Sequence, residues 1–286
     1  MTRHLEVFSI DIVRGCQLLC VGCPNSSIRL KVKDMPVDVF AGIMENFDGT
    51  TRRLRLFNYG EPLLHRDLPG IFKVLEKNKH KFSYLEITTN GQFVRWDQFE
   101  EILKTKLLGE VIISCDGDGT PESFERMRPP AKWDKLVNFL TKVGELRDKY
   151  HPDLHLSSRT VLLNSADAER WNALLHPLGW KTEFISWLRL PGATENMSAA
   201  PPKPGVGICH FLRNKTTYVS WDGTVLPCCG HPSAGDFGNI TSQKWSSIQF
   251  GNAREEFVDT LKNRRETLNI CSGCEFGSNF LRDPIP

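Results

Sequence analysis

The sequence predicts an α/β protein in which a parallel sheet, covered by helices, forms an open, partial barrel followed by a small second domain. Three observations support this prediction. Short apolar runs alternate with amphipathic stretches from Leu5 to about Phe184, a pattern typical of strand–helix units. The composition then changes to a Pro-rich stretch at 199–205, which is typical of a linker. Seven of the nine cysteines fall into two clusters, one in each predicted domain.

The overall composition indicates a folded protein without a nucleic-acid or membrane partner. Its 286 residues correspond to about two domains. Lys and Arg number 36 against 34 Asp and Glu, so the net charge of +2 lacks the excess of a polyanion binder. Hydrophobic residues at 40% suffice for a packed core. No apolar run approaches the ~18 residues of a membrane-spanning helix, and the N-terminus lacks a secretory signal's apolar region. We therefore expect a cytoplasmic location.

Six strands are expected where apolar residues gather in short runs. They are residues 7–12, 54–57, 84–87, 110–113, 154–156 with 160–162, and 182–185. Helical patterns fill the intervals at 37–47, 67–77, 96–104, 133–149 and 166–175, several of them beside helix-start residues such as Pro36, Asp67 and Pro121. Six units are too few for a closed eight-unit barrel, so a partial (β/α)6 barrel fits best. Functional side chains on such a sheet lie in loops at the carboxyl ends of the strands.

The second domain is expected to span residues 201–286, after a first domain of residues 1–200. Residues 217–221 and 224–226 flank Asp222-Gly223, a pair that favours a tight hairpin turn. One helix is expected at 245–262. Five of the nine cysteines lie in this segment, which is too small to build a generous core of its own. A metal cluster would hold it together.

Cys16, Cys20 and Cys23 directly follow the first predicted strand, so their thiols share the loop at its carboxyl end. An odd number of cysteines without a secretory signal does not indicate a disulfide framework. Three cysteines this close can bind three irons of a 4Fe–4S cube and leave the fourth iron open. The alternative is a structural zinc site, which prefers four protein ligands. With no fourth ligand nearby, the spacing favours the iron cluster.

The loops after three later strands carry further motifs, namely Asn58-Tyr59-Gly60-Glu61-Pro62, Thr88-Thr89-Asn90-Gly91 and Ser114-Cys115-Asp116-Gly117. Together with the Cys-x3-Cys-x2-Cys loop, their order and position resemble the radical S-adenosylmethionine (SAM) superfamily, whose core is a partial TIM-like barrel. The resemblance implies a SAM-binding 4Fe–4S cluster on the three clustered cysteines. The residues that it places against SAM are Tyr59, Gly60, Glu61, Pro62, Asn90, Ser114, Asp116 and Arg159.

Two positions depart from the family pattern. Gly22 stands where the residue before the third cysteine is usually aromatic. A packing contact near the adenine is therefore expected to be lost or supplied by another residue. Asn58 replaces the first glycine of the family's Gly-Gly-Glu-Pro loop, at a position that is not a ligand.

The resemblance also implies the chemistry. SAM's amino and carboxylate groups chelate the open iron, and the reduced cluster cleaves the sulfonium to a 5′-deoxyadenosyl radical that abstracts hydrogen from a C–H bond. The cofactor supplies this chemistry, while the protein positions the substrate and excludes side reactions. A flavodoxin- or ferredoxin-type reductant is the implied partner.

A second set of cysteines, Cys209, Cys228, Cys271 and Cys274, lies in the C-terminal segment. Residues 223–228 resemble the Gly-x4-Cys hairpin of SPASM and Twitch domains, the auxiliary-cluster modules of radical SAM enzymes. Four cysteines fully ligate one auxiliary 4Fe–4S cluster. A structural zinc knuckle is the alternative.

Length and cysteine spacing most resemble a group of aminoglycoside-pathway enzymes that includes the butirosin 2-deoxy-scyllo-inosamine dehydrogenase. This resemblance implies oxidation of a secondary alcohol of a sugar or cyclitol to a ketone, with the auxiliary cluster as electron acceptor. A second hypothesis is a sugar or peptide epimerase that uses Cys229 as hydrogen-atom donor. A third is a ribosomal-peptide maturase, and a zinc-stabilised binding protein is the non-enzyme alternative. Arg126 and Arg128 follow the fourth predicted strand and could reach the site, but a solvated helix end is the simpler account.

Overall fold

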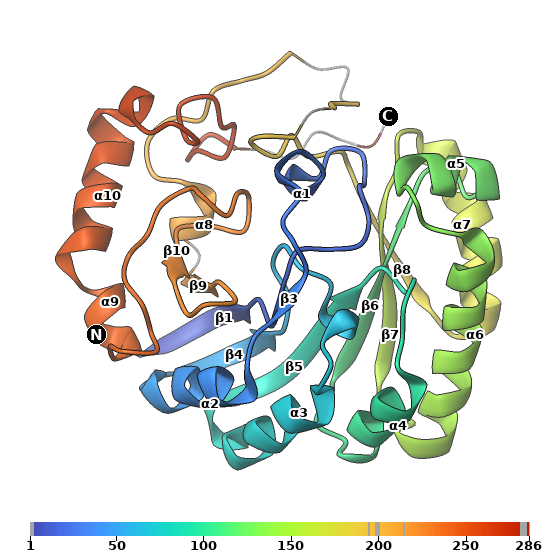
Figure 1. The fold of residues 1–286 in the computed structure, drawn as a ribbon. Helices are drawn as coiled ribbons and strands as arrows, with labels where there is room; N and C mark the ends of the chain where they lie inside the picture. The colour runs from blue at the N-terminus through green and yellow to red at the C-terminus, as the bar shows by residue number, and fades with distance from the viewer. Residues whose placement is uncertain (1–2, 194, 198–200, 214, 281–284, 286) are drawn as a thin grey trace.

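The computed structural model describes residues 3–193, 195–197, 201–213, 215–280 and 285, and its centre is an eight-stranded sheet of order β10-β9-β1-β4-β5-β6-β7-β8. Six of these strands are parallel neighbours and overlap the six predicted ones, with ends that differ by up to four residues. They are β1 (His4–Ile10), β4 (Thr50–Arg55), β5 (Phe82–Thr89), β6 (Glu110–Asp116), β7 (His155–Val161) and β8 (Lys181–Ile185). The prediction of a partial barrel is therefore confirmed (Figure 1).

Helices cover the outer face of the sheet, as Figure 1 shows. They are α2 (Val37–Asn46), α3 (Leu68–Lys77), α4 (Trp96–Lys104), α5 (Pro121–Met127), α6 (Trp133–Tyr150) and α7 (Ala168–Leu175). Their starts follow helix chemistry, since the Asp67 carboxylate accepts the Gly70 N–H at 2.8 Å and the Thr120 hydroxyl accepts the Ser123 N–H at 3.3 Å. The core lies between these helices and the sheet, where Leu54, Ile87 and Phe139 are fully buried.

Short elements connect the strands and helices. The first cysteine loop contains β2 (Val13–Arg14), α1 (Pro24–Ile28) and β3 (Lys33–Asp34). Single 3-10 turns occupy Pro62–Leu64, Lys79–Lys81, Ser165–Asp167, His176–Leu178 and Arg265–Thr267. Within the described residues, no helix combines the length and the apolar character needed to cross a membrane.

The C-terminal segment extends the same sheet. The predicted hairpin forms as β9 (Thr216–Val219) and β10 (Val225–Leu226), and β9 pairs in parallel with β1. Gly223 has a φ of +87°, which the turn requires and glycine adopts without strain. Helix α8 (His210–Arg213) precedes this hairpin. Part of the predicted linker, residues 199–200, lies outside the described residues, and the domain boundary at 200 stays a prediction.

The prediction of one helix at 245–262 is wrong, because the segment forms two helices, α9 (Trp245–Gln249) and α10 (Asn252–Asn263). Gly251 separates them with extended backbone angles, φ −90° and ψ 164°. Glycine disfavours a helix interior, and a Cβ here would lie 2.4 Å from the Ser247 carbonyl oxygen. Apolar residues stand on both sides of the break, at Trp245 and Ile248 and at Phe257 and Leu261, which favours one helix in the sequence.

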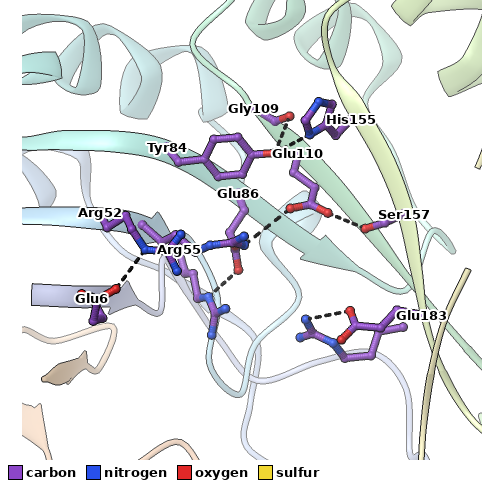
Figure 2. A network of polar contacts seen from close by, with 12 residues as sticks. Glu6, Arg52, Arg55, Tyr84, Glu86, Gly109, Glu110, His155, Ser157 and Glu183 are labelled. Atoms are coloured by element: carbon purple, nitrogen blue, oxygen red, sulfur yellow. Dashed lines mark hydrogen bonds and ion pairs between the residues drawn. The ribbon is translucent and has the colours of Figure 1, made fainter. Parts of the chain in front are cut away.

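The inner face of the sheet, opposite the helices, is polar. Side chains alternate between the two faces of a strand. Because Leu54, Leu85 and Ile87 are buried in the outer core, the residues next to them in sequence point to the inner face. Figure 2 shows the resulting network. Arg53 bonds Glu86 at 2.6 Å, and Arg55 also pairs with Glu86, which is fully buried. Further along, the Ser157 hydroxyl donates to Glu110 at 2.6 Å, and Arg159 pairs with Glu183 at 3.4 Å.

Candidate iron–sulfur and SAM site

The first cysteine loop brings Cys16, Cys20 and Cys23 together at the carboxyl end of β1, all three half-buried. The Cys23 N–H donates to the Cys20 carbonyl at 3.2 Å, and Pro24 begins helix α1 immediately afterwards. Cys16 Sγ lies 3.4 Å from the Leu18 N–H and 3.4 Å from Asn90 Nδ2. Donors directed at a sulfur stabilise it as a thiolate, the form that binds iron.

Electrostatics at this loop depend on burial and on one cation. Burial raises the pKa of Cys16 to about 12 and that of Cys20 to about 11, and the Arg128 guanidinium opposes both shifts. The expectation of a solvated Arg128 is wrong, because its side chain is buried and paired with Asp116. The short helix α5 turns this residue inward beside the cysteine loop. An arginine there offsets the negative charge of metal-bound thiolates.

Asp11, just past β1, organises the loop that follows β4. Its buried carboxylate accepts three backbone N–H groups, from Asn58 at 3.3 Å, Tyr59 at 3.2 Å and Gly60 at 3.0 Å. Gly60 is required at its position, because a Cβ there would lie 1.6 Å from the Val13 carbonyl oxygen. The loop therefore rests directly on the base of the cysteine loop.

Glu61 is buried and fully engaged. Its carboxylate accepts the Thr89 hydroxyl at 2.5 Å, the Asn90 N–H at 2.8 Å and the Leu63 N–H at 3.1 Å. Pro62 follows and opens a 3-10 turn. Glu61 thus fixes the Thr89–Asn90 strand end, and Asn90 in turn reaches Cys16.

Ser114, Asp116 and Arg159 lie at neighbouring positions of β6 and β7, where Ser114 is paired in register with Arg159. Asp116 accepts the Val161 N–H at 3.2 Å in addition to its bond with Arg128. Arg159 pairs with Glu183 on β8. All three therefore stand at the carboxyl edge that also carries the cysteine loop. Cys115 between them points into the core and is fully buried.

The indole of Trp187 fills the space beside Gly22, where the family's usual aromatic residue is absent. A Cβ on Gly22, whose φ is +75°, would lie 2.4 Å from Cζ2 of the Trp187 indole. The ring lines a cavity of about 250 Å³ with Val161, Ile185 and the cysteine loop. Trp187 Nε1 is buried and has no hydrogen-bond partner within the described residues. An apolar cavity with a flat ring and a vacant donor beside the cysteines suits an aromatic ligand group.

Two buried acids predict a pH-dependent stability for the cluster-free chain. Burial raises the pKa of Asp11 from 3.8 to about 7 and that of Glu61 from 4.5 to about 7. A raised folded-state pKa contributes stability that is fully present below about pH 4 and is lost as the pH rises to about 7. Each acid thus removes about 1.4 kcal/mol of unfolding free energy per pH unit in this window. We expect the urea midpoint to fall between pH 5 and 7 and the slope to decrease in Asp11→Asn. An unchanged slope in that variant would contradict the assignment.

The second cysteine set also converges. Cys209 lies before α8, Cys228 follows β10, and Cys271 and Cys274 share one turn, in which the Cys274 N–H donates to the Cys271 carbonyl at 3.2 Å. Burial raises the pKa of Cys228, Cys271 and Cys274, and the proximity of Cys209 contributes to each shift. Arg265 fixes the turn by donating to the Cys271 carbonyl at 2.9 Å and the Cys274 carbonyl at 3.0 Å. The four thiols thus come from three segments of the chain, with Cys209 near each of the other three.

Cys229 adjoins Cys228 and is half-buried. Burial raises the pKa of its thiol, against the opposing effects of the Tyr218 hydroxyl and the Arg55 guanidinium. Among the described residues, no three His, Cys, Asp or Glu side chains form a group suited to a single metal ion. A 4Fe–4S cube has a different requirement, because each thiolate binds its own iron atom.

Comparison with protein families identifies the class of protein. The radical SAM superfamily matches residues 10–176, more than half of the chain, and the chain therefore belongs to this superfamily. The SPASM iron–sulfur cluster-binding domain matches residues 209–275. The protein is thus a radical SAM enzyme with a C-terminal SPASM domain, whose cofactors are SAM and two iron–sulfur clusters. No curated protein matches the chain.

Solved structures share the fold across nearly the whole chain. BtrN in complex with AdoMet and 2-DOIA is 20% identical with a TM-score of 0.59, and the match covers 100% of this chain and 98% of BtrN. Native anSMEcpe with bound AdoMet is 18% identical with a TM-score of 0.65, covering 97% and 92% of the two chains. Streptococcus suis SuiB bound to S-adenosylmethionine is 12% identical with a TM-score of 0.59, covering 99% and 77%. At these identities the likeness concerns the fold alone.

Proposed function

We propose that this enzyme oxidises a secondary alcohol of a sugar- or cyclitol-type small molecule to a ketone. The observation that carries the proposal is the polar inner face of the barrel below the cysteine loop. Arg55, Glu86, Glu110 and Ser157 line it in one network that runs through Arg53, and Arg159 forms a separate pair with Glu183 (Figure 2). A substrate with several hydroxyl groups needs a comparable number of donors and acceptors, because buried polar groups without partners are costly.

In this proposal the two cysteine sets have separate roles. Cys16, Cys20 and Cys23 hold the SAM-binding cluster, and Cys209, Cys228, Cys271 and Cys274 hold the auxiliary cluster. Bound there, SAM on a reduced cluster supplies hydrogen-atom abstraction from carbon, and the auxiliary cluster accepts one electron. Oxidation of a carbinol to a ketone also releases one proton. The carboxylate of Glu183, which is paired with Arg159 and accessible to solvent, is the acceptor that we propose for it.

The contacts with SAM are proposed for two groups of residues at the carboxyl edge of the sheet. Tyr59, Gly60, Glu61 and Pro62 form the loop proposed to receive SAM's amino group, and Asn90, Ser114, Asp116 and Arg159 form the opposing edge. Of these, Glu61 and Asp116 already have protein partners on both carboxylate oxygens. Their proposed role is to hold neighbouring backbone in place for the cofactor.

Trp187 is proposed to stack on the adenine of SAM. We expect Trp187→Ala to weaken SAM binding to the reconstituted protein about tenfold, since stacking on an aromatic side chain contributes about 1–3 kcal/mol per base. Trp187→Phe retains the ring face and is expected to recover most of the affinity. Equilibrium dialysis with labelled SAM measures both variants. Equal affinity in Trp187→Ala and wild type would refute the stacking role.

The reaction is tested anaerobically with a panel of amino sugars and cyclitols and a flavodoxin- or ferredoxin-type reductant. We expect one 5′-deoxyadenosine and one ketone per substrate consumed, with deuterium transferred from a labelled carbinol carbon to the 5′-deoxyadenosine. SAM cleavage without ketone across the panel would count against alcohol oxidation.

Epimerisation through Cys229 remains the second candidate, because this thiol adjoins an auxiliary ligand and faces Tyr218 and Arg55. An epimerase incorporates solvent deuterium at the substrate carbon and loses this incorporation in Cys229→Ala. A dehydrogenase shows neither effect. Peptide substrates belong in the same assay, since anSMEcpe has been solved with bound AdoMet and the Cp18Cys peptide.

A further inference from the structure

The side chain of Tyr59 crosses from the first domain to the second. Tyr59 lies in the loop after β4 that is proposed to receive SAM, yet its hydroxyl donates to the backbone carbonyl of Cys228 at 2.8 Å. Cys228 is a proposed ligand of the auxiliary cluster, and its Sγ accepts the Gly230 N–H at 3.4 Å. One hydrogen bond therefore connects the SAM loop with the backbone that carries an auxiliary ligand.

The loop around Tyr59 is held on both sides. On the side of the first domain, Asp11 accepts the backbone N–H groups of residues 58–60, and the Glu61 N–H donates to the Gly15 carbonyl at 3.1 Å. Toward the second domain, Asn58 Nδ2 donates to the Val219 carbonyl on β9 at 3.1 Å. A loop fixed at both ends transmits a small displacement instead of absorbing it.

We propose that Tyr59 is a positioning residue that couples occupancy of the SAM loop to the auxiliary cluster through the Cys228 backbone. SAM binding displaces the loop backbone, and the Tyr59 hydroxyl transfers this displacement to the cluster ligand. Hydrogen bonds around the ligands set the reduction potential of an iron–sulfur cluster. The potential of the auxiliary cluster therefore depends on SAM, and coupling between two sites is reciprocal. This inference rests on the proposed ligand role of Cys228.

The test is a redox titration of the auxiliary cluster, followed by electron paramagnetic resonance, with and without SAM. In wild type we expect SAM to shift the midpoint potential. In Tyr59→Phe, which keeps the ring and removes the hydroxyl, we expect a more negative potential and no SAM-dependent shift. The negative direction follows because the variant loses a hydroxyl dipole whose positive end faces the ligand backbone.

Tyr84→Phe is the matched control. The Tyr84 hydroxyl also donates to a backbone carbonyl, that of Gly109 at 3.1 Å, but at the amino end of the sheet (Figure 2). It is expected to leave the auxiliary potential and its SAM response as in wild type. Any of three results overturns the coupling. The potential of wild type does not respond to SAM, the response persists in Tyr59→Phe, or it disappears equally in Tyr84→Phe. The iron content of wild type tells the two failures apart. About eight irons per chain with no SAM response refutes the coupling alone, whereas only about four irons refutes the proposed function as well.

Discussion

Alanine at Cys16, Cys20 and Cys23 together is expected to lower the iron content from about eight to about four per chain and to abolish SAM cleavage. The two values correspond to two cubes and one cube. The reason is geometric, since the three half-buried thiols share one loop and the four cysteines proposed to hold the auxiliary cluster come from a separate segment. Iron and labile sulfide measured after anaerobic reconstitution test this expectation.

The matched control is Cys115→Ala. Cys115 is fully buried in the core beside the same site, so its replacement costs packing and removes no iron. A fall from about four irons to none in the triple variant would leave the second cysteine set without a cluster. Alcohol oxidation would then lack its electron acceptor, and the dehydrogenase proposal would be refuted.

Gly60→Ala is expected to destabilise the chain by about 3 kcal/mol and to eliminate SAM binding. The added Cβ would lie 1.6 Å from the Val13 oxygen and 2.6 Å from its carbon, so backbone must move. Overpacking of this kind costs about 1–3 kcal/mol, and occasionally more. The same movement breaks the bonds between Asp11 and the loop. Urea denaturation and SAM dialysis give the two readouts.

Gly42→Ala serves as the control for this substitution. Gly42 lies inside helix α2, and a Cβ there meets no atom within 4 Å. Alanine in a helix interior is expected to stabilise by about 0.5–1 kcal/mol relative to glycine. If Gly60→Ala keeps the stability or the SAM affinity of wild type, the loop tolerates displacement, and the role assigned to its close contacts is wrong.

Local patterns in the sequence predict the barrel well and identify both cysteine sets, whose ligand roles stay predictions. Strand and helix periods repeat over six units, and each motif stands at or just after the carboxyl end of a strand, so chain order alone brings the motifs to one edge of the sheet. Such features depend on neighbours within about ten positions. They can be recognised without knowing any long-range contact.

Residues whose role depends on distant partners are the ones that the sequence does not reveal. Asp11 acts through backbone groups of residues 58–60, and Arg265 through the carbonyls of the cysteine turn. Arg128 is a charged residue at a helix end, and such side chains usually lie in solvent. Its burial depends on the ion pair with Asp116, which lies 12 positions earlier. Trp187 fills the space at Gly22 from more than 150 positions away. Asp11 itself lies within the predicted strand 7–12, and only the structure, where β1 ends at Ile10, places it in the loop.

The pairing of β9 with β1 has a consequence for biosynthesis. β1 carries the first cysteine loop, and its second neighbour, Thr216–Val219, is made about 200 residues later. At the usual 5–20 residues per second, translation leaves this strand an open edge for on the order of 10–40 s. Unpaired edges invite aggregation. A nascent chain that stalls before residue 216 therefore carries Cys16, Cys20 and Cys23 on a sheet whose β1 edge is still unpaired.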